Sequence, residues 1–552
     1  MTVSNIPMAA DVQKSFAQKM LDGIEKVGNK VPHPVLMFLY LIIIVVVLSH
    51  FLYLLGVSVT EVIAVPVPVE AEGVYYLDSS EPWQAYPPET YKADYEIKEQ
   101  TTTIRSLLST EGLRFIFTSF VNNFAGFSVV AVILVAMVGV GVAEEAGLMG
   151  TLIRKTVKVT PRRFITFILI FVGVLSSVAT DAGYLILIPL GAVAFLSLGR
   201  HPLAGVAAAF GGVSAVFAVN ILIAPVDGML TEITNEAINL AGGTPITIVA
   251  NYYFAVASTV ILSIIATVIT DRIIEPRLGP YQADETASAE EAQDDATLAA
   301  EGRGLQYALY GFLGMVALIL LLTLPAGAPL RDPETGAIIG NTPFMDSLIF
   351  IITLFFLIAG LGYGLGAGTI KGSGDVIKGV TKTFASLAGL IFMLLMISQF
   401  IAFFNFSRMP QVTAVWMADT LERANIGALP LLIGFILVIM ILNFIIPNVV
   451  PKWAIFAPIF IPVFMRLGVA PQTVLSAYRL GDSPTNVITP LMVYLPFVLT
   501  VVQRYQKEAG IGTVVALMLP YTLVIAIGWT LLFILWFVLG IPLGPGYPVS
   551  VP

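Results

Sequence analysis

The chain has 552 residues, of which 57% are hydrophobic and only 12% are charged, and its mean hydropathy is +0.90. This composition leaves too little polar surface for a water-soluble protein, and many apolar runs reach the ~20 residues that cross a bilayer. The absence of cysteine excludes disulfides and thiolate metal sites, the three histidines are scattered, and a net charge of −8 gives no reason to expect nucleic acid. We therefore expect a polytopic protein in a lipid bilayer.

Residues 1–33 contain four lysines and no apolar core, which favours a cytosolic N-terminal segment over a cleaved signal peptide. Apolar segments then follow one another through the rest of the chain. Those that we expect to cross or enter the membrane are 34–57, 115–148, 164–177 with 184–198, 203–224, 249–270, 305–325, 347–367, 384–404, 431–446 with 453–464, the interrupted segment 472–502, and 512–539.

Two pairs of short apolar segments predict re-entrant helical hairpins. Residues 162–199 begin with two arginines and are followed by Arg200, so both ends are expected on the cytosolic side. A polar turn at 176–183 (SSVATDAG) separates the two arms. Residues 430–467 repeat this pattern around a turn at 447–451 (PNVVP) and by parity enter from the opposite side. Irregular backbone is tolerated in a membrane only inside protein or beside a cavity, so we expect both turns to line one.

The predicted fold class is an all-α polytopic membrane protein with about nine transmembrane helices plus two re-entrant hairpins, in a cell (inner) membrane. Its N-terminus is expected in the cytosol and its C-terminus outside, because the proposed inside loops hold 18 Lys and Arg and the outside loops hold 6. An acidic, Ala-rich stretch at 279–304 predicts a cytosolic linker between a first half, 34–278, and a second half, 305–552. The loops assigned to the outside are 58–113, 225–248, 326–346, 405–430 and 540–552.

Each half contains a hairpin followed by an interrupted helix. In the first half, Asp181 at the hairpin turn precedes Asn220 at the helix interruption by 39 positions. In the second half, Asn443 near the hairpin turn precedes Asp482 by the same spacing. Together with the opposite entry of the hairpins, this indicates an inverted-topology repeat, in which substrate and ion sites lie where hairpin tips meet broken helices.

Two charged residues lie in the broken segment 472–502, which Gly481 and Pro484 interrupt. A charge at membrane depth is costly, so such residues usually face an internal pathway and have partners. Arg479 either binds a substrate carboxylate or neutralises Asp482, three positions further along the same helix face. Asp482 is expected to bind an ion or a proton, a role that pairing with Arg479 does not exclude.

Four other side chains have two interpretations each. Asp181 either caps a helix N-terminus or carries a proton or sodium. Asn220 and Asn448 either bind a ligand or satisfy unwound backbone. Trp453 either stacks on an aromatic substrate or anchors the chain at the membrane interface. If sodium binds, we expect it near Asp181, Asn220 and Asp482.

Five long stretches carry a specific pattern: SSVATDAGYLILIPL (176–190), LSLGRHPLAGVAAAFGGVSAVFAVNILIA (196–224), KWAIFAPIFIPVFMRLGVAP (452–471), AYRLGDSPTNVITPLMVY (477–494) and GIPLGPG (540–546). In these stretches the chain closely resembles the p-aminobenzoyl-glutamate transporter (AbgT) family. The resemblance implies a homodimer with nine transmembrane helices and two re-entrant hairpins in each protomer, which matches the count made from hydropathy and charge.

The resemblance also implies functional roles for the residues that match the family's motifs. These residues are Asp181, Asn443, Trp453, Pro471, Arg479, Asp482 and Pro490. The family's second hairpin turn usually reads GSASAKW, whereas this chain reads PNVVPKW at 447–453. Two hydroxyls and a glycine are replaced by an amide, two valines and two prolines, which predicts a stiffer turn and a different substrate or ion preference.

We therefore expect an ion-coupled secondary transporter, and not an enzyme. As the resemblance implies, its substrates are p-aminobenzoyl-glutamate-like aromatic carboxylates, or sulfonamide antimetabolites for export. No cofactor is expected; a sodium ion or proton gradient would drive transport, since no Gly-Lys-Ser/Thr follows the glycine run 360–368. The alternatives are a dicarboxylate or other organic-anion carrier of the same architecture, an intramembrane hydrolase built on Asp181 and Asp482, and a membrane scaffold that transports nothing.

Overall fold

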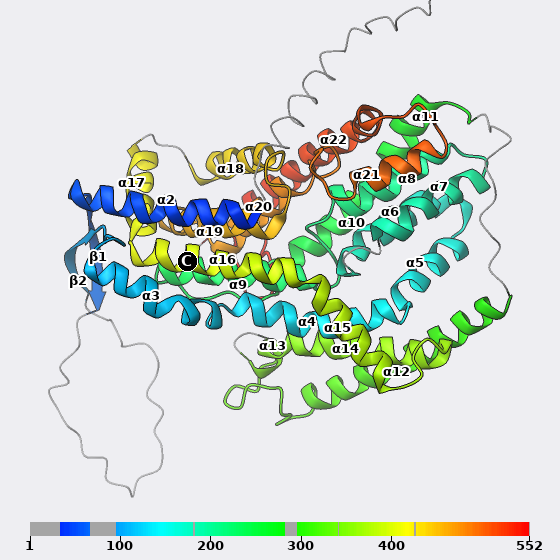
Figure 1. Cartoon of the computed structure of the whole chain (residues 1–552), viewed down its shortest axis with the longest axis horizontal. Helices are drawn as coiled ribbons and strands as arrows, with labels where there is room; N and C mark the ends of the chain where they lie inside the picture. Colours follow the sequence, from blue (N-terminus) through cyan, green and yellow to red (C-terminus); the bar gives the residue numbers. More distant parts are fainter. Residues whose placement is uncertain are drawn as a thin grey trace, which may run out of the picture.

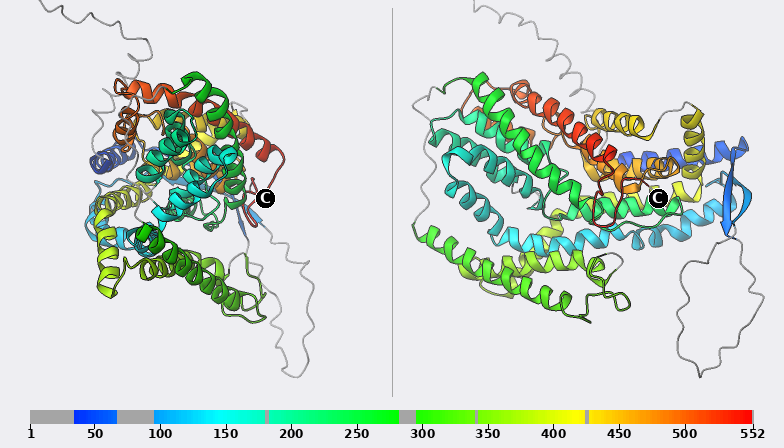
Figure 2. Two further views of the ribbon diagram at one scale, coloured as in Figure 1. Left: turned by 90° about the vertical axis from the view of Figure 1, so that its right-hand side faces the viewer. Right: turned by 180° about the vertical axis from the view of Figure 1, so that it is seen from behind.

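The computed structural model describes residues 34–66, 95–179, 183–281, 295–339, 342–423 and 427–550. Within these ranges the chain is almost entirely helical, and long helices run side by side along the longest axis of the molecule (Figures 1 and 2). The predicted N-terminal segment, residues 282–294 of the predicted linker and the hairpin turn at Asp181 lie outside the described residues.

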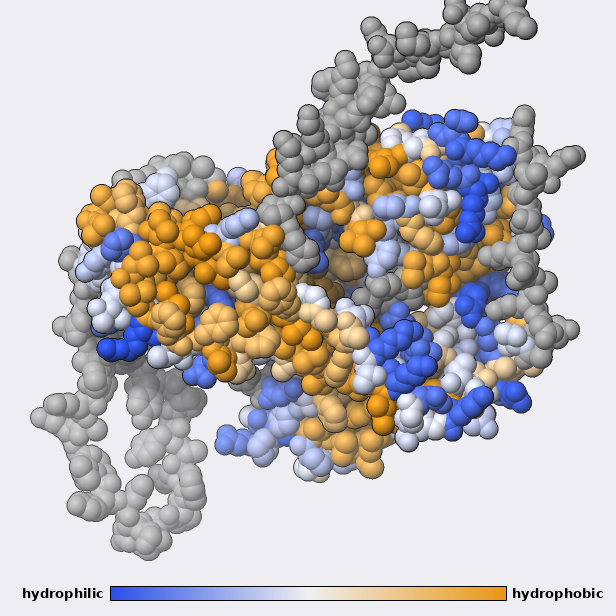
Figure 3. Space-filling view, in the orientation of Figure 1, coloured by the Kyte–Doolittle hydropathy of each residue, from blue (hydrophilic) through white to orange (hydrophobic). Residues whose placement is uncertain are grey.

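Eight helices of the described chain are long and apolar enough to cross a membrane, or nine if the bent pair Leu148–Val159 and Arg162–Val178 is one span. Many large apolar side chains are exposed on the outer surface, and hydrophilic ones gather toward the right-hand end of the view in Figure 3. Such a surface suits lipid tails and would be a liability in water. The predicted polytopic, helical class is confirmed.

One group of elements, here called the scaffold, contributes helices from both halves of the chain. Contacts join α12 to α14, α14 to α4, and α16 to both α2 and α3. The scaffold elements are α2 (Pro34–Leu54), β1 (Ser58–Pro66), β2 (Tyr95–Thr103), α3 (Thr110–Ala125), α4 (Ser128–Glu145), α12 (Asp295–Thr323), α13 (Pro343–Asp346), α14 (Leu348–Ala367), α15 (Ser373–Ser386), α16 (Ala388–Phe406) and α17 (Met409–Arg423).

Four of the loops assigned to the outside contain regular structure: 58–113, 225–248, 326–346, which holds the short helix α13, and 405–430. Strands β1 and β2 form an antiparallel ribbon with Ser58 opposite Thr103, and α17 occupies much of the stretch 405–430. On the other side, α12 already begins at Asp295, so the last ten residues of the predicted linker are helical.

The remaining elements form two similar units. Helix α5 (Leu148–Val159) leads into the first, and the chain bends by 120° before α6. The first unit comprises the hairpin α6 (Ile165–Leu175), η2 (Ser176–Ala179), η3 (Gly183–Leu187) and α7 (Ile188–Ser197), the broken helix α8 (Pro202–Phe210), η4 (Gly211–Ala215) and α9 (Pro225–Leu240), and then α10 (Tyr252–Ile269), η5 (Thr270–Ile274) and α11 (Glu275–Leu278). The second comprises the hairpin α18 (Ala428–Leu442) and α19 (Val449–Arg466), the broken helix α20 (Pro471–Asp482) and α21 (Leu495–Gln503), and then α22 (Ile511–Val538).

The two units pack against each other in a reciprocal manner. Within each unit, the first hairpin arm contacts the first half of the broken helix: α6 contacts α8 and η4, and α18 contacts α20. Between units, the second hairpin arm contacts the other unit's second half-helix: α19 contacts α9, and α7 contacts α21. Helices α10 and α22 also contact each other. This exchange of partners is the arrangement expected of an inverted-topology repeat.

One predicted loop is wrong. Residues 225–248 were expected outside the membrane as a loop, but Pro225–Leu240 form helix α9, which continues the interrupted helix and packs against α19 and α4. Pro225 lies in the first helical turn, and the Asp227 carboxylate accepts a hydrogen bond from the Ala224 backbone N–H at 2.7 Å. A helix packed between protein elements needs no continuous apolar run, so hydropathy alone did not reveal it.

Ion pairs join loops and helix ends that were assigned to the same side of the membrane. Arg200 pairs with Asp271 at 2.6 Å and also with Glu275. Arg154 lies 2.6 Å from Glu301. Lys382 on α15 is likewise 2.6 Å from Glu145 at the end of α4. These contacts agree with a common side for the loops assigned to the inside.

Candidate functional site

The second hairpin is tied to its broken helix through the amide of Asn443. Asn443 follows α18 directly and is fully buried. Its Nδ2 donates to the carbonyl oxygen of Asp482 at 2.8 Å, to Oγ1 of Thr485 at 2.8 Å and to Oδ1 of Asn486 at 2.7 Å. The backbone after Asp482 is unwound, so these side chains satisfy groups that a continuous helix would have paired.

A buried ion pair lies beside this amide. The ammonium Nζ of Lys452, on the first turns of α19, is 2.7 Å from Oδ1 of Asp482 and 2.5 Å from Oδ1 of Asn443. Both charged side chains are fully inaccessible to solvent. The pair therefore joins the second hairpin arm to the C-terminal end of α20 in an environment where an unpartnered charge would be very unfavourable.

The first unit shows a matching arrangement around Asn220. Its Nδ2 donates to Oγ of Ser177 at 2.9 Å and to the carbonyl oxygens of Val174 and Leu175 at 3.1 and 3.3 Å. Its Oδ1 accepts from the backbone N–H of Leu222 at 2.9 Å. An asparagine thus joins the hairpin to the interrupted helix in both units, on the helix in the first and on the hairpin in the second.

The ion-pair partner of Arg479 is a residue that the sequence did not suggest. Both Arg479 and Asp482 lie on α20, but the Nη1 of Arg479 forms an ion pair with Asp227 of α9 and donates to the carbonyl oxygen of Ala218 at 3.1 Å. Of the two interpretations of Arg479, the structure shows no direct ion pair with Asp482, and binding of a substrate carboxylate stays a prediction. Lys452 pairs with Asp482 instead, because hairpin and broken helix approach each other at that point.

A cavity of about 470 Å³ lies where the two hairpins, the two helix interruptions and the scaffold meet. This volume is in the range of small-molecule sites. Scaffold helices α4 and α16 contribute Met137 and Met393 to its wall. The lining from the two units is Ser177, Val178, Tyr184, Phe217, Pro225, Val226, Met229, Pro447, Asn448, Val449, Val450, Asp482, Asn486, Leu491, Met492, Val493 and Tyr494.

Aromatic rings from both units face this cavity. The rings of Tyr184 and Tyr494 are stacked, with centroids 4.1 Å apart and planes inclined by 12°. Tyr184 belongs to the first hairpin, whereas Tyr494 lies just before α21, so the stacked pair bridges the units. Phe217, in the first helix interruption, adds a third ring to the lining.

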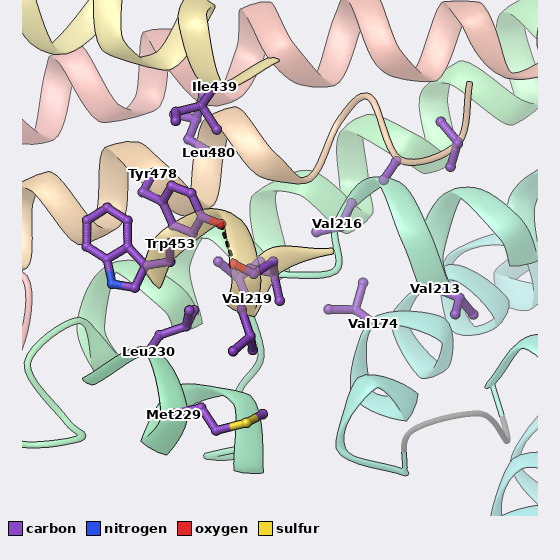
Figure 4. Close-up of a cluster of buried hydrophobic side chains, with 14 of the residues drawn as sticks. Val174, Val213, Val216, Val219, Met229, Leu230, Ile439, Trp453, Tyr478 and Leu480 are labelled. Carbon is purple, nitrogen blue, oxygen red and sulfur yellow. Dashed lines mark hydrogen bonds between the residues drawn. The ribbon is translucent and has the colours of Figure 1, made fainter. Parts of the chain in front are cut away.

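Trp453 is fully buried between α19 and α9 and is not part of the described cavity lining. Its ring stacks on Tyr478 at a centroid distance of 4.4 Å, and its Nε1 donates to Oγ1 of Thr234 at 2.9 Å. The Tyr478 hydroxyl in turn donates to the carbonyl oxygen of Val449, the dashed line in Figure 4. In this conformation the indole packs against Tyr478, which holds the hairpin turn through its hydrogen bond to Val449.

The remaining predicted residues lie at different distances from the cavity. Asn448 and Asp482 line it, and Asn443 lies directly behind Asp482. Pro490 is in the unwound segment next to the lining residue Leu491. Pro471 starts α20, about 16 Å along the helix from Asp482 at 1.5 Å per residue. Asp181 lies outside the described residues.

The structure also reveals residues that the sequence did not single out. Asp227 was placed in a loop and so was not considered as a partner for Arg479. Lys452 appears in the sequence within the stretch PNVVPKW, where no role follows from it. The tyrosines Tyr184 and Tyr494 gave no signal, since they approach each other only through folding. The one signal for Lys452 in the sequence is a charged residue at the start of the apolar stretch 453–464.

No group of three or more His, Asp or Glu side chains with metal-binding geometry occurs in the described part of the chain. The site instead combines paired charges, asparagine amides and an apolar, aromatic cavity between two broken helices. These features, at membrane depth and within an inverted repeat, define a membrane transporter.

The sequence profile of the AbgT putative transporter family matches residues 19–551. The p-aminobenzoyl-glutamate transport protein of Escherichia coli (strain K12) is 34% identical over 553 residues, which covers 99% of each chain. The chain therefore belongs to the AbgT putative transporter family.

Two solved structures share the fold. The YdaH transporter of Alcanivorax borkumensis, described as having an unusual topology, is 37% identical and superposes with a TM-score of 0.82 over 93% of this chain and 100% of its own. MtrF of Neisseria gonorrhoeae, described as illuminating a class of antimetabolite efflux pumps, is 36% identical, with a TM-score of 0.80 over 96% of this chain and 100% of its own.

Proposed function

We propose that this chain is an ion-coupled secondary transporter of p-aminobenzoyl-glutamate-like aromatic carboxylates, and that sulfonamide antimetabolites are candidate substrates for export. The family membership supports transport, and the name of the Escherichia coli relative supports the substrate class. The description of MtrF supports antimetabolite export.

The observation that carries the proposal is the position of the cavity. It is bounded by both hairpin turns and both helix interruptions on one side and by α4 and α16 of the scaffold on the other. A ligand held there touches the elements with the fewest regular backbone hydrogen bonds, which are the ones best able to rearrange. Movement of the two units against the scaffold would expose the ligand alternately to the two sides.

The lining suits a ligand with an aromatic ring and polar ends. Tyr184, Phe217 and Tyr494 offer faces and edges for an aromatic ring. Asn448 offers an amide donor for a carboxylate or carbonyl oxygen. Val449 and Val450 replace polar positions of the hairpin turn with apolar surface, which favours the ring over the carboxylates at that end of the cavity.

Coupling to a cation gradient would act through Asp482, which borders the cavity and contacts both the second hairpin and the unwound backbone. A change in the charges around this carboxylate alters how firmly hairpin and broken helix are held together. Either a proton or a sodium ion would provide that change, and the substrate would move with or against it.

Uptake into proteoliposomes tests the proposal. Purified protein is reconstituted, and p-aminobenzoyl-glutamate, a sulfonamide and succinate are compared under imposed proton and sodium gradients. We expect gradient-dependent movement of at least one aromatic substrate, faster than succinate. Failure of all three to move under either gradient would refute ion-coupled transport, and preference for succinate would refute the aromatic substrate class.

A further inference from the structure

The second unit contains a buried positive charge, the ammonium group of Lys452. Lys452 places its ammonium between a carboxylate oxygen of Asp482, at 2.7 Å, and the amide oxygen of Asn443, at 2.5 Å. Carboxylate and amide carbonyl oxygens are the ligands that hard cations such as sodium and calcium also take. The ammonium thus occupies the position that an incoming cation would need in order to reach these two oxygens together.

The first unit lacks this feature. Asn443 directly follows the first hairpin arm α18 of the second unit, and Ser176 directly follows the first hairpin arm α6 of the first unit. Lys452 lies nine positions after Asn443, and the residue nine positions after Ser176 is Leu185. A lysine is therefore present in one unit only, although the helices around it are arranged alike in both.

Because the site is buried, the ammonium group of Lys452 and a sodium ion cannot occupy it together. Lys452, Asp482 and Asn443 are all inaccessible to solvent, so water screens the charges little. Asp482 has one negative charge, and the ammonium already balances it. A sodium ion beside the same carboxylate would add an unbalanced positive charge within a few ångströms of Lys452, in surroundings where such a charge is strongly unfavourable.

We propose that Lys452 is a resident cation that excludes sodium from Asp482 and Asn443, and that removal of its charge converts these residues into a sodium site. One consequence rests on the proposed transport function: sodium coupling through Asp482 would require the ammonium group of Lys452 to move away first. The selectivity of the second unit is then set by a side chain that touches no substrate.

Sodium-dependent thermal stability tests this without any substrate. Four proteins are compared in detergent, with sodium titrated against choline at constant ionic strength: wild type, Asp482→Asn, Lys452→Gln, and Lys452→Gln combined with Asp482→Asn. We expect Asp482→Asn to leave the sodium-dependent shift of the wild type unchanged. Lys452→Gln should gain a saturable rise in melting temperature with sodium, and the double variant should lose that rise. Lys382→Gln, which breaks an exposed ion pair, is the matched control and should gain no sodium response.

Two results would overturn the proposal. One is a sodium response of the wild type that disappears in Asp482→Asn, since sodium would then bind alongside Lys452. The other is a Lys452→Gln variant that gains no sodium response, or one whose sodium response is kept by the double variant. If Lys452→Gln unfolds, the uncharged double variant should still fold. Recovery of Lys452→Gln by sodium during purification then supports the proposal, and failure to recover at any sodium concentration contradicts it. Because no transport is measured, these outcomes are separate from failure of the proposed function.

Discussion

Arg479 of α20 and Asp227 of α9 form an ion pair between the two repeat units, although 252 positions separate them in the chain. Asp227 also caps its own helix through the Ala224 N–H, and Arg479 also donates to the carbonyl oxygen of Ala218. The pair therefore fixes the start of α9, the preceding interruption and α20 relative to one another. Its position explains why a cation at this depth is tolerated.

Replacing Asp227 by Ala should destabilise the protein strongly. Arg479, only 6% exposed, would remain buried without its carboxylate, and breaking a buried pair in this way typically costs about 3–5 kcal/mol. Thermal unfolding in detergent measures the loss. Lys382→Ala, which breaks the exposed pair with Glu145, is the control and should change stability little. Equal effects of the two variants would show that burial of the Arg479 pair is unimportant.

Replacing Asp482 by Asn should abolish coupling to the ion gradient. The amide preserves the shape of the side chain but removes the charge that Lys452 balances and that borders the cavity. Uptake into proteoliposomes with and without an imposed gradient measures coupling, and Asp346→Asn at the exposed helix α13 serves as control. Gradient-driven transport at the wild-type rate in Asp482→Asn would reduce Asp482 to a structural role.

Replacing Gly481 by Ala should separate the second hairpin from its broken helix. A Cβ at Gly481 would lie 2.7 Å from Cβ of Ile439 and 2.8 Å from the carbonyl oxygen of Ile436, both on α18. Such overpacking costs about 1–3 kcal/mol. Gly434→Ala is a matched control, since a Cβ at Gly434 of the same α18 meets nothing within 4 Å. The melting temperature should fall for Gly481→Ala only, and a fall for both would contradict the close approach.

Replacing Trp453 by Ala should affect stability more than substrate preference. The indole is fully buried, stacks on Tyr478 and donates to Thr234, so its removal should cost about 3–5 kcal/mol. Tyr494→Ala, by contrast, should reduce the preference for aromatic over aliphatic acids because Tyr494 lines the cavity. Competition uptake with both acid types measures the preference. Loss of aromatic preference in Trp453→Ala alone would indicate that the indole stacks on substrate in another conformation.

Acidification should weaken the start of α8 through His201. Burial lowers the pKa of His201 below its usual 6.5, although the nearby Glu275 acts in the opposite direction. Its Nδ1 accepts from the Leu203 N–H, which requires the neutral ring, and a cation is unfavourable at a helix N-terminus. The unfolded state binds the proton more readily, so this stabilisation is complete above pH 6.5 and is lost as the pH falls through the folded pKa. His201→Asn keeps a capping group and should flatten the pH–stability curve below about pH 6.5. An unchanged curve would exclude His201 as its cause.

Much of the fold followed from local pattern. Apolar runs and the distribution of Lys and Arg predicted the helical membrane class, and the short paired segments predicted the two hairpins, because the cost of placing polar groups in lipid acts along each segment separately. The equal spacing of Asp181 and Asn220, and of Asn443 and Asp482, pointed to the repeat. In the structure, Asn443 contacts the backbone of Asp482 directly.

The amino-acid sequence by itself determined the helical membrane class and which charges need partners at membrane depth. Only the tertiary structure decided who those partners are. Pairing of Arg479 with Asp482 along one helix was one of the two interpretations that the sequence left open, yet Arg479 pairs with Asp227, while Asp482 pairs with Lys452. The physical reason is that a buried charge is balanced by the nearest opposite charge in space, and that neighbour is set by the packing of α9, α19 and α20 rather than by spacing along the chain.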